Sequence, residues 1–342
     1  MSPHTVADLG ERALIGRLRA RITLPPWVIV GPGDDAAVVA TARGAYDVLT
    51  VDAQVEGVHF DRRFVPPHAI GHRALAVNLS DLAAMGAEPR AALLSLALPA
   101  EFSVDDFDGL VDGFLGLADR HRTALIGGNI TRTDGPVVAD VTALGSVRPR
   151  RILSRQGARP GDAVYVTGSP GIAAIGLRLL RAAAEDGSPS GRQLDATVWS
   201  SSPERYLQPE PRVRAGQLLG RNRAASSCMD LSDGLADGLR QIALASGVGM
   251  SIDASLLPRG AELDRWHAEH GGDPVETIFA GGDDYELLFT VRPAQRGRLR
   301  MVRQQLGALS LTRIGVVTKD TALVVTTGDR IRPLPQGYEH YR

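Results

Sequence analysis

The segment His72-Arg-Ala-Leu-Ala-Val-Asn-Leu-Ser-Asp-Leu-Ala-Ala-Met-Gly-Ala-Glu-Pro89 is the most informative stretch of this chain. Its apolar residues predict a helix that packs on at least one side, and Gly86 and Pro89 end it. Asn78 and Asp81 are three residues apart, so they share one face of that helix. A carboxylate on a mostly apolar helix is costly to bury unless a cation compensates it.

Other carboxylates stand far away in the sequence. They have no run of Lys or Arg beside them and occur at Asp34-Asp35, Asp52, Asp230 and Asp233. Thr50 and Asp52 share one face of a predicted strand, because side chains alternate along a strand. We expect these acids to converge on divalent metal ions that hold a polyphosphate.

The length of 342 residues suggests two domains. Apolar residues become sparse around Arg148–Gly161, so we place the domains at 1–148 and 149–342. The composition, 44% hydrophobic and 23% charged, is that of an ordinary globular protein. A net charge of −1 argues against binding to nucleic acid, which favours a basic excess.

The chain has a single lysine, Lys319, among its 38 basic residues. A Walker-type phosphate loop needs a lysine in a glycine-rich turn, and a protein kinase needs one on a strand. Lys319 has neither context, which excludes both architectures. The single cysteine, Cys228, excludes an intramolecular disulfide and a cysteine-based zinc site. No apolar run approaches a membrane span and no signal pattern is present, so we expect a cytoplasmic protein.

The apolar patterns predict alternating strands and helices, and thus an α/β fold. Strands are predicted at Val28–Val30, Tyr46–Asp52, Ala91–Leu98, Ala124–Ile126, Val137–Leu144, Asp162–Thr167, Met250–Ala254, Asp283–Val291 and Leu323–Thr326. Besides the first segment, helices are predicted at 8–20, Phe102–Ala118 and Ile172–Ala184. Residues 186–211, rich in Ser, Pro and Gly, are expected to form the longest surface loop.

Three local features are candidates for contact with a ligand, and two of them admit a second interpretation. Gly127-Gly128 follows a buried strand, where glycine lets a ligand approach the backbone. The turn Gly168-Ser-Pro-Gly171 before a helix is either a phosphate site or an ordinary turn. His59 is either a ligand or a capping residue of its loop, and sequence spacing does not decide between them.

Two short patterns occur twice in the same order. Asp230-Leu-Ser-Asp233 echoes Asn78-Leu-Ser-Asp81, and Gly281-Gly-Asp-Asp284 echoes Gly127-Gly-Asn129. The paired echoes suggest two domains that are built on related plans, each of which contributes acids to one site.

Five motifs in order resemble the thiamine-monophosphate kinase family over nearly the whole chain. They are Gly31-x-Gly-Asp-Asp-Ala-Ala37, Val51-Asp-x-x-Val-Glu-Gly-Val-His-Phe60, Ala76-Val-Asn-Leu-Ser-Asp-Leu-Ala-Ala-Met-Gly-Ala87, Asp230-Leu-Ser-Asp-Gly-Leu235 and Gly281-Gly-Asp-Asp-Tyr-Glu-Leu287. The resemblance implies the two-domain PurM-like fold of the aminoimidazole-ribonucleotide-synthetase-like superfamily. It also implies a homodimer, in which the N-terminal α/β domain pairs its sheet with a second subunit.

The implied reaction transfers the γ-phosphate of ATP to thiamine monophosphate and gives thiamine diphosphate. The acceptor is already an oxyanion, so no catalytic general base or covalent nucleophile is expected. The difficulty is the repulsion between two polyanions, which bound Mg²⁺ ions and positioning relieve.

The resemblance assigns roles to individual residues. The implied metal ligands are Asp35, Thr50, Val51, Asp52, Asp81, Asn129, Asp230 and Asp233, with Val51 acting through its backbone. The implied nucleotide contacts are Gly128, Asn129, Arg155, Ser232 and Phe107. His59 and Asp283 are expected to face the thiamine substrate.

Four positions depart from the family's pattern. Asn129 replaces an acid, and an uncharged amide should bind Mg²⁺ more weakly; Asp134 or Asp140 is a candidate to compensate. Val51 replaces Thr or Ser, and Asp283 replaces Glu, which shortens the reach by one methylene. Pro335 replaces an aromatic residue that covers the thiazole.

Two other functions remain open at this point. One is another ATP-dependent reaction of the superfamily, such as an amidine-forming ligase, and the other is a nucleotide-binding paralogue with weakened catalysis. Relatives that make selenophosphate or mature hydrogenases use a cysteine in an N-terminal loop or at the C-terminus. Cys228 lies in neither place, which disfavours both of those reactions.

Overall fold

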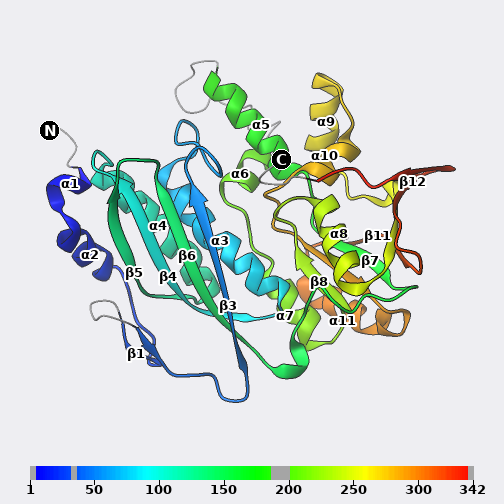
Figure 1. Ribbon diagram of the computed structural model, residues 1–342, viewed down its shortest axis with the longest axis horizontal. Helices are drawn as coiled ribbons and strands as arrows, with labels where there is room; N and C mark the ends of the chain where they lie inside the picture. Colours follow the sequence, from blue (N-terminus) through cyan, green and yellow to red (C-terminus); the bar gives the residue numbers. More distant parts are fainter. Residues whose placement is uncertain (1–4, 32–36, 186–200, 338–342) are drawn as a thin grey trace. The chain divides into compact units, whose positions relative to one another are not determined.

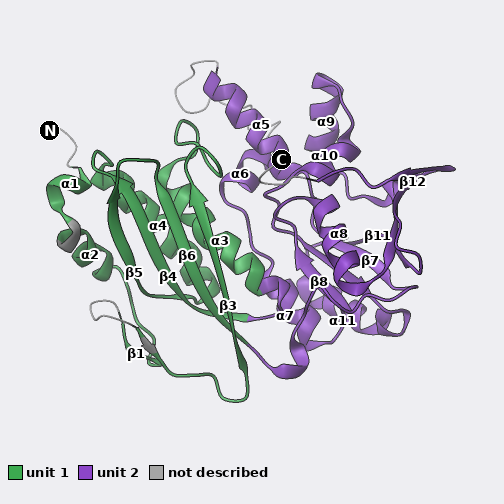
Figure 2. Cartoon of the chain, in the orientation of Figure 1, with its two compact units in different colours: residues 1–82, 88–146 green, residues 83–87, 147–342 purple. Residues whose placement is uncertain are grey.

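The computed structural model describes residues 5–31, 37–185 and 201–337. Figure 1 shows its helices and strands, and Figure 2 its division into two compact units. Unit 1 comprises residues 1–82 and 88–146, and unit 2 comprises residues 83–87 and 147–342. No helix within the described ranges is long and apolar enough to cross a membrane.

Unit 1 is built around a four-stranded sheet in the order β3-β6-β4-β5. Its elements are α1 (Val6–Leu9), α2 (Glu11–Arg19), β1 (Val28–Val30), β2 (Val38–Val39), β3 (Tyr46–Val55), α3 (Pro67–Ala84), β4 (Glu88–Pro99), α4 (Val104–His121), β5 (Ala124–Thr133) and β6 (Val138–Val147). Strands β4 and β5 are parallel and are joined by α4, whereas β6 runs antiparallel to β4. Strands β1 and β2 form a separate antiparallel pair.

Helices α3 and α4 lie together along one face of this sheet (Figure 1). Glycines bring the two helix backbones close together. A Cβ added at Gly71 of α3 would lie 1.8 Å from the Leu110 carbonyl oxygen, and one at Gly113 of α4 would lie 1.8 Å from that of His68. Gly86, at a φ of +68°, follows the end of α3 in the left-handed conformation that favours glycine. The predicted helix is therefore present, although it begins earlier than expected, at Pro67.

The opposite face of the sheet is open and partly apolar. Leu49 and Val51 of β3 are 68% and 60% exposed, and Leu93 of β4 is 39% exposed. On β4, Leu94 and Leu96 point to the other face than Leu93 and are buried, as the alternation of side chains along a strand requires. Isolated exposed apolar residues are ordinary, but several on one sheet face suggest a contact surface.

Unit 2 contains a seven-stranded sheet in the order β13-β12-β9-β11-β7-β10-β8. Its elements are η1 (Pro149–Arg151), β7 (Ala163–Thr167), α5 (Ile172–Glu185), α6 (Ser202–Leu207), α7 (Val213–Arg221), β8 (Ser227–Asp230), α8 (Leu235–Ser246), β9 (Gly249–Asp253), η2 (Ala254–Leu256), α9 (Ala261–His270), α10 (Pro274–Ala280), β10 (Leu287–Val291), η3 (Pro293–Gln295), α11 (Arg296–Leu306), β11 (Leu311–Thr318), β12 (Leu323–Thr327) and β13 (Arg330–Pro333). Among the described residues of unit 2, β12 and β9 pair in parallel, and the other neighbouring strands are antiparallel.

Two expectations about local structure were wrong. The expected loop 186–211 contains the helix α6, while residues 186–200 lie outside the described ranges. The strand expected over Asp283–Val291 begins only at Leu287. Asp283 and Tyr285 have positive φ angles of 65° and 49°, which a strand excludes.

The sequence echoes also do not occupy equivalent places. Asn78–Asp81 lies within the helix α3, whereas Asp230 ends the strand β8 and Asp233 follows in a loop. Gly127-Gly128 lies inside the strand β5, whereas Gly281-Gly282 precedes β10. The repeated letters therefore mark two different local structures rather than two copies of one.

Candidate active site

In unit 1, the central contact of the predicted site joins β3 to α3. The Thr50 hydroxyl donates a hydrogen bond to Oδ2 of Asp81. Asp52 lies two residues after Thr50, on the same side of the strand, and both side chains are half-buried. The structure therefore brings a hydroxyl and two carboxylates to the α3 side of the strand.

Asn78 provides a second oxygen near this contact. Its side chain is fully buried, and its Nδ2 donates to the Ala74 carbonyl 3.0 Å away. Within the described residues its Oδ1 has no donor. A buried oxygen without a donor is costly, so it marks a place for a water, an ion or a ligand group. Asn78 is three residues before Asp81, so both side chains lie on one face of α3.

The complete ligand set is not assembled within the part of the chain that the structure describes. Across residues 5–31, 37–185 and 201–337, no group of three or more His, Cys, Asp and Glu side chains is placed to hold a metal ion. Asp35 lies outside these ranges. Mg²⁺ does not require such a group, because it binds through one or two carboxylates and keeps waters or phosphate oxygens as its other ligands. The oxygens of Asp52, Asp81 and Asn78 fit that demand.

Asn129 lies far from this contact. It is in β5, at the opposite edge of the sheet from Asp52 in β3. Three strand spacings separate the two edges, or about 14 Å. Both residues cannot bind one ion in one copy of the chain, because ligands of the same Mg²⁺ lie within about 4 Å of each other. In register, Asn129 pairs with Ser95, which pairs with Asp140 on its other side.

Two residues assigned to the nucleotide have structural explanations. A Cβ at Gly128 would lie 1.8 Å from the Leu94 carbonyl oxygen, so this position requires glycine because strands β5 and β4 approach closely. Phe107 is fully buried on the inner side of α4. It belongs to the core of unit 1 and presents no surface to an adenine ring.

His59 lies in a tight turn that follows β3. Its Nδ1 accepts a hydrogen bond from the Val55 N–H at 3.1 Å, and its own N–H donates to the Val55 carbonyl. A ring nitrogen that accepts this bond leaves the proton on Nε2. The histidine therefore stabilises the turn, which also orients its ring.

In unit 2, backbone hydrogen bonds join the loop after Asp230 to the loop 281–286. The N–H groups of Asp283 and Tyr285 donate to the carbonyl oxygens of Ser232 and Leu231, and the Leu231 N–H donates to the Glu286 carbonyl. A Cβ at Gly282 would lie 2.6 Å from the backbone carbonyl oxygen of Ser232. The segment that follows Asp230 is thus held directly against the loop 281–286.

Glu286 anchors the end of that loop. It is fully buried, and its carboxylate accepts hydrogen bonds from Arg205, Arg212 and the Thr167 hydroxyl. The Arg212 Nε lies 2.7 Å from Oε2, and its Nη2 lies 2.6 Å from Oε1. Burial alone would raise the pKa of Glu286, but the two guanidinium groups outweigh it and hold this pKa below the usual value.

Asp284 anchors the loop to α5. Its Oδ2 accepts from the Gly171 N–H at 2.6 Å, and its Oδ1 accepts from the Ala173 N–H at 3.2 Å. Burial raises the pKa of Asp284 to about 7, although these two bonds oppose the shift. The carboxylate caps the first turn of α5, so the turn Gly168–Gly171 is not open to a phosphate. Sequence patterns alone gave no sign of this cap.

Several predicted nucleotide and metal residues gather near the start of α8. The Ser232 hydroxyl lies 3.2 Å from Oδ2 of Asp233. Asp237, which the sequence analysis did not single out, has its pKa raised first by burial and also by the charge of Asp233, while Arg155 lowers it. Asp233 precedes α8 and Asp237 lies in its first turn, so no regular spacing in the sequence indicated that the two carboxylates are neighbours. The arrangement joins an arginine, a hydroxyl and two carboxylates.

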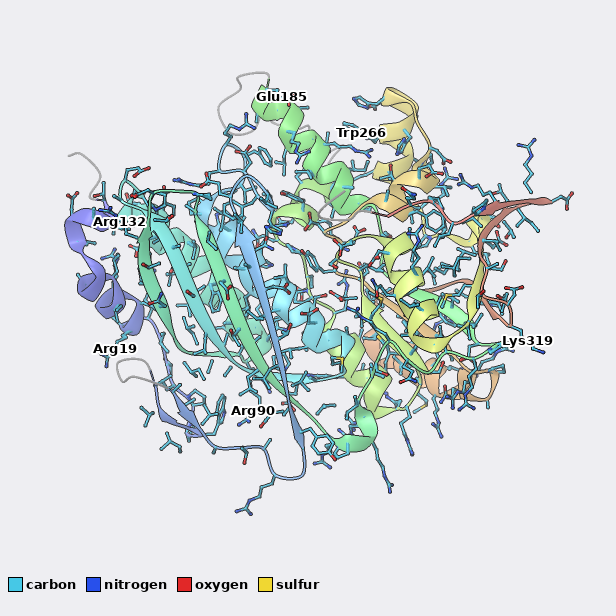
Figure 3. All side chains as sticks on the ribbon, in the orientation of Figure 1. Arg19, Arg90, Arg132, Glu185, Trp266 and Lys319 are labelled. Carbon is cyan, nitrogen blue, oxygen red and sulfur yellow. The ribbon has the colours of Figure 1, made fainter. Side chains whose placement is uncertain are left out.

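The lone lysine and cysteine take no part in these contacts. Lys319 is exposed in the turn between β11 and β12 (Figure 3). Cys228 is buried, and burial raises the pKa of its thiol, which disfavours a thiolate nucleophile.

Comparison with known proteins gives matches over nearly the whole chain. The models for the N-terminal and C-terminal domains of AIR synthase related proteins match residues 33–147 and 159–328. The thiamine-monophosphate kinase of Bacillus subtilis is 35% identical over 98% of this chain and 100% of its own length.

Solved structures agree with these matches. The thiamine-monophosphate kinase of Stenotrophomonas maltophilia is 39% identical, covers 91% of this chain and 95% of its own, and superposes with a TM-score of 0.80. A structure described as AaThiL complexed with AMPPCP and TMP is 29% identical over 100% of both chains, with a TM-score of 0.75.

Proposed function

This chain belongs to the thiamine-monophosphate kinase family, and we propose that it transfers a phosphoryl group from ATP to thiamine monophosphate. The match to relatives over their full length carries this conclusion, and the two-domain AIR synthase related fold agrees with it. The solved relative that holds AMPPCP, an ATP analogue, together with TMP supports both substrates. The absence of a lysine in any phosphate-binding turn is consistent with this family.

The residues of this chain act by binding and orienting rather than by moving a proton. Arg155 and Ser232 are proposed to hold the nucleotide, and His59 and Asp283 to hold the thiamine substrate. The acceptor phosphate is already ionised, so no general base is needed. Holding the two bound reactants in a fixed orientation lowers the entropic cost of the transfer step.

We further propose that Mg²⁺ binds to the acids of the site. Asp52, Asp81, Asp230 and Asp233, with the Thr50 hydroxyl and the Val51 carbonyl, are the proposed ligands in the described chain. The unpaired Oδ1 of Asn78 supports an oxygen-binding ion beside Asp81. Bound Mg²⁺ would neutralise phosphate charge during transfer.

We propose that the enzyme is a homodimer formed through the sheet of unit 1. The exposed Leu49, Val51 and Leu93 supply an apolar face on β3 and β4. A second copy also resolves the position of Asn129, because Asp52 and Asn129 lie on opposite edges of one sheet. Edges from two copies could bring these ligands together, which one copy cannot do.

Replacing Leu49 by glutamate should convert the dimer to a monomer, because a buried charge without a partner costs several kcal/mol. Light scattering after gel filtration measures the mass directly. Leu244→Glu is the matched control, since Leu244 of α8 is 83% exposed and lies in the other unit. A Leu49→Glu protein that stays dimeric would show that this face is not the interface.

Replacing Asn129 by aspartate should lower the Mg²⁺ concentration needed for half-maximal activity, by about threefold to tenfold. The added charge strengthens attraction to a divalent ion, whereas the amide offers only a dipole. A Mg²⁺ titration at saturating ATP measures the effect. Asp119→Asn, which removes an exposed carboxylate from α4 of the same unit, serves as the control for a change of charge. An unchanged titration in Asn129→Asp would remove Asn129 from the ligand set.

The proposed reaction is tested by incubating the protein with ATP, Mg²⁺ and thiamine monophosphate and separating the products. Thiamine diphosphate and ADP in equal amounts are expected. ATP binding without product would instead indicate a nucleotide-binding paralogue, and turnover of ATP only with an amide acceptor would indicate a ligase. Since ATP is the phosphoryl donor, we propose that the enzyme works in the cytoplasm.

A further inference from the structure

The loop Gly281–Glu286 holds its backbone in an uncommon conformation. Among the described residues, four non-glycine residues have a positive φ, and two of them are Asp283 and Tyr285. The left-handed region costs an L-residue about 1–2 kcal/mol. Such a conformation persists where surrounding contacts fix it, and it occurs often at functional sites. Here the contacts are the backbone bonds to Leu231 and Ser232.

The three residues that follow Asp283 each have a defined contact. Asp284 caps α5, and Glu286 is held between Arg205 and Arg212. The Tyr285 hydroxyl donates to Oδ1 of Asp283 at 3.0 Å. Tyr285 is only 5% exposed, whereas Asp283 is half-buried. The loop thus presents the Asp283 carboxylate while its neighbours are fixed in the protein.

The hydroxyl of Tyr285 makes a charge-assisted hydrogen bond, which is stronger than a bond between neutral groups. It restricts the rotation of the Asp283 side chain and therefore fixes the direction of its carboxylate. An aspartate reaches one methylene less far than a glutamate, so a bond to a residue two positions away suits the shorter side chain. Thiamine carries a positively charged thiazolium ring, to which a fixed carboxylate is complementary.

We propose that Tyr285 is a positioning residue that fixes the Asp283 carboxylate for recognition of the thiamine moiety. This proposal rests on the proposed function, in which Asp283 faces the thiamine substrate. In this role Tyr285 acts through Asp283 and not on the reacting phosphates. Its loss should therefore weaken the binding of thiamine monophosphate and leave the binding of ATP unchanged.

The test is Tyr285→Phe, which keeps the buried ring and removes only the hydroxyl. We expect the KM for thiamine monophosphate to rise about tenfold, with the KM for ATP and kcat changed less than twofold. Tyr165→Phe is the matched control, because Tyr165 is also a buried tyrosine of unit 2 and stacks on Phe289. This control should change neither KM.

A double-mutant cycle with Asp283→Ala separates the proposal from a general structural effect. Once Asp283 is absent, Tyr285→Phe should have no further effect on either KM. Additive effects, or equal rises of both KM values, would overturn the positioning role. If Tyr285→Phe does not fold, Asp283→Asn is the second test: its amide oxygen still accepts the bond from the Tyr285 hydroxyl while the charge is lost, so the KM for thiamine monophosphate should rise, and an unchanged KM would overturn the proposal.

The same measurements distinguish a failure of the proposed function from a failure of the positioning role of Tyr285. If the wild-type protein makes no thiamine diphosphate, the proposed function is wrong. If product forms but Asp283→Ala leaves the KM for thiamine monophosphate unchanged, the reaction stands and the positioning proposal falls. A rise with Asp283→Ala but none with Tyr285→Phe assigns recognition to Asp283 alone and also overturns the proposal.

Discussion

Replacing Glu286 by glutamine is expected to lower the free energy of unfolding by about 3–5 kcal/mol. The carboxylate is fully buried and is shared by Arg205 and Arg212, whose side chains are 24% and 12% exposed. Glutamine has nearly the same shape but no charge, so two largely desolvated guanidinium groups would lose their counterion. The removal of one member of a buried ion cluster costs more than the cluster itself contributes, because the remaining charges stay buried.

Urea unfolding monitored by circular dichroism measures this change. Glu276→Gln is the matched control, because Glu276 pairs with Arg332 at the surface of unit 2, where it is 44% exposed. A surface pair contributes about 0–1 kcal/mol. Equal losses for the two variants would show that the buried cluster is not a principal source of stability. Glu286 directly follows Tyr285 in the chain. Loss of its ion pairs should therefore also displace Tyr285 from Asp283 and raise the KM for thiamine monophosphate.

Replacing Asp81 by asparagine is expected to reduce kcat by about 10²–10³-fold while the protein stays folded. Asparagine keeps an oxygen that accepts the bond from the Thr50 hydroxyl, so the contact between β3 and α3 is preserved. Only the negative charge is lost, and this charge is what a divalent cation at the site would require. Steady-state kinetics with saturating ATP, thiamine monophosphate and Mg²⁺ measures the effect.

Two further variants complete this test. Asp119→Asn removes an exposed carboxylate from α4 of the same unit and should leave kcat unchanged. Thr50→Val removes the hydroxyl that donates to Asp81, and its effect on kcat should be smaller than that of Asp81→Asn. A loss of less than about threefold in Asp81→Asn would exclude Asp81 as an essential metal ligand.

The amino-acid sequence alone was sufficient for the family and for most of the elements around the site. The apolar pattern of 72–84 predicted α3, and the alternation in 46–52 predicted β3, because both patterns depend on residues that are close in the chain. The single lysine and its surroundings in the sequence were enough to exclude the common phosphate loops. The assignment of individual ligands still rests on the family resemblance, and it stays a prediction.

Only the tertiary structure decided which of these residues meet. The order of the strands, which no local pattern encodes, places Asp52 and Asn129 on opposite edges of one sheet. No local pattern encodes the cap that Asp284 provides for α5 or the bond between Tyr285 and Asp283 either. Periodicity is set by neighbours along the chain, whereas burial and pairing depend on segments that only folding brings together.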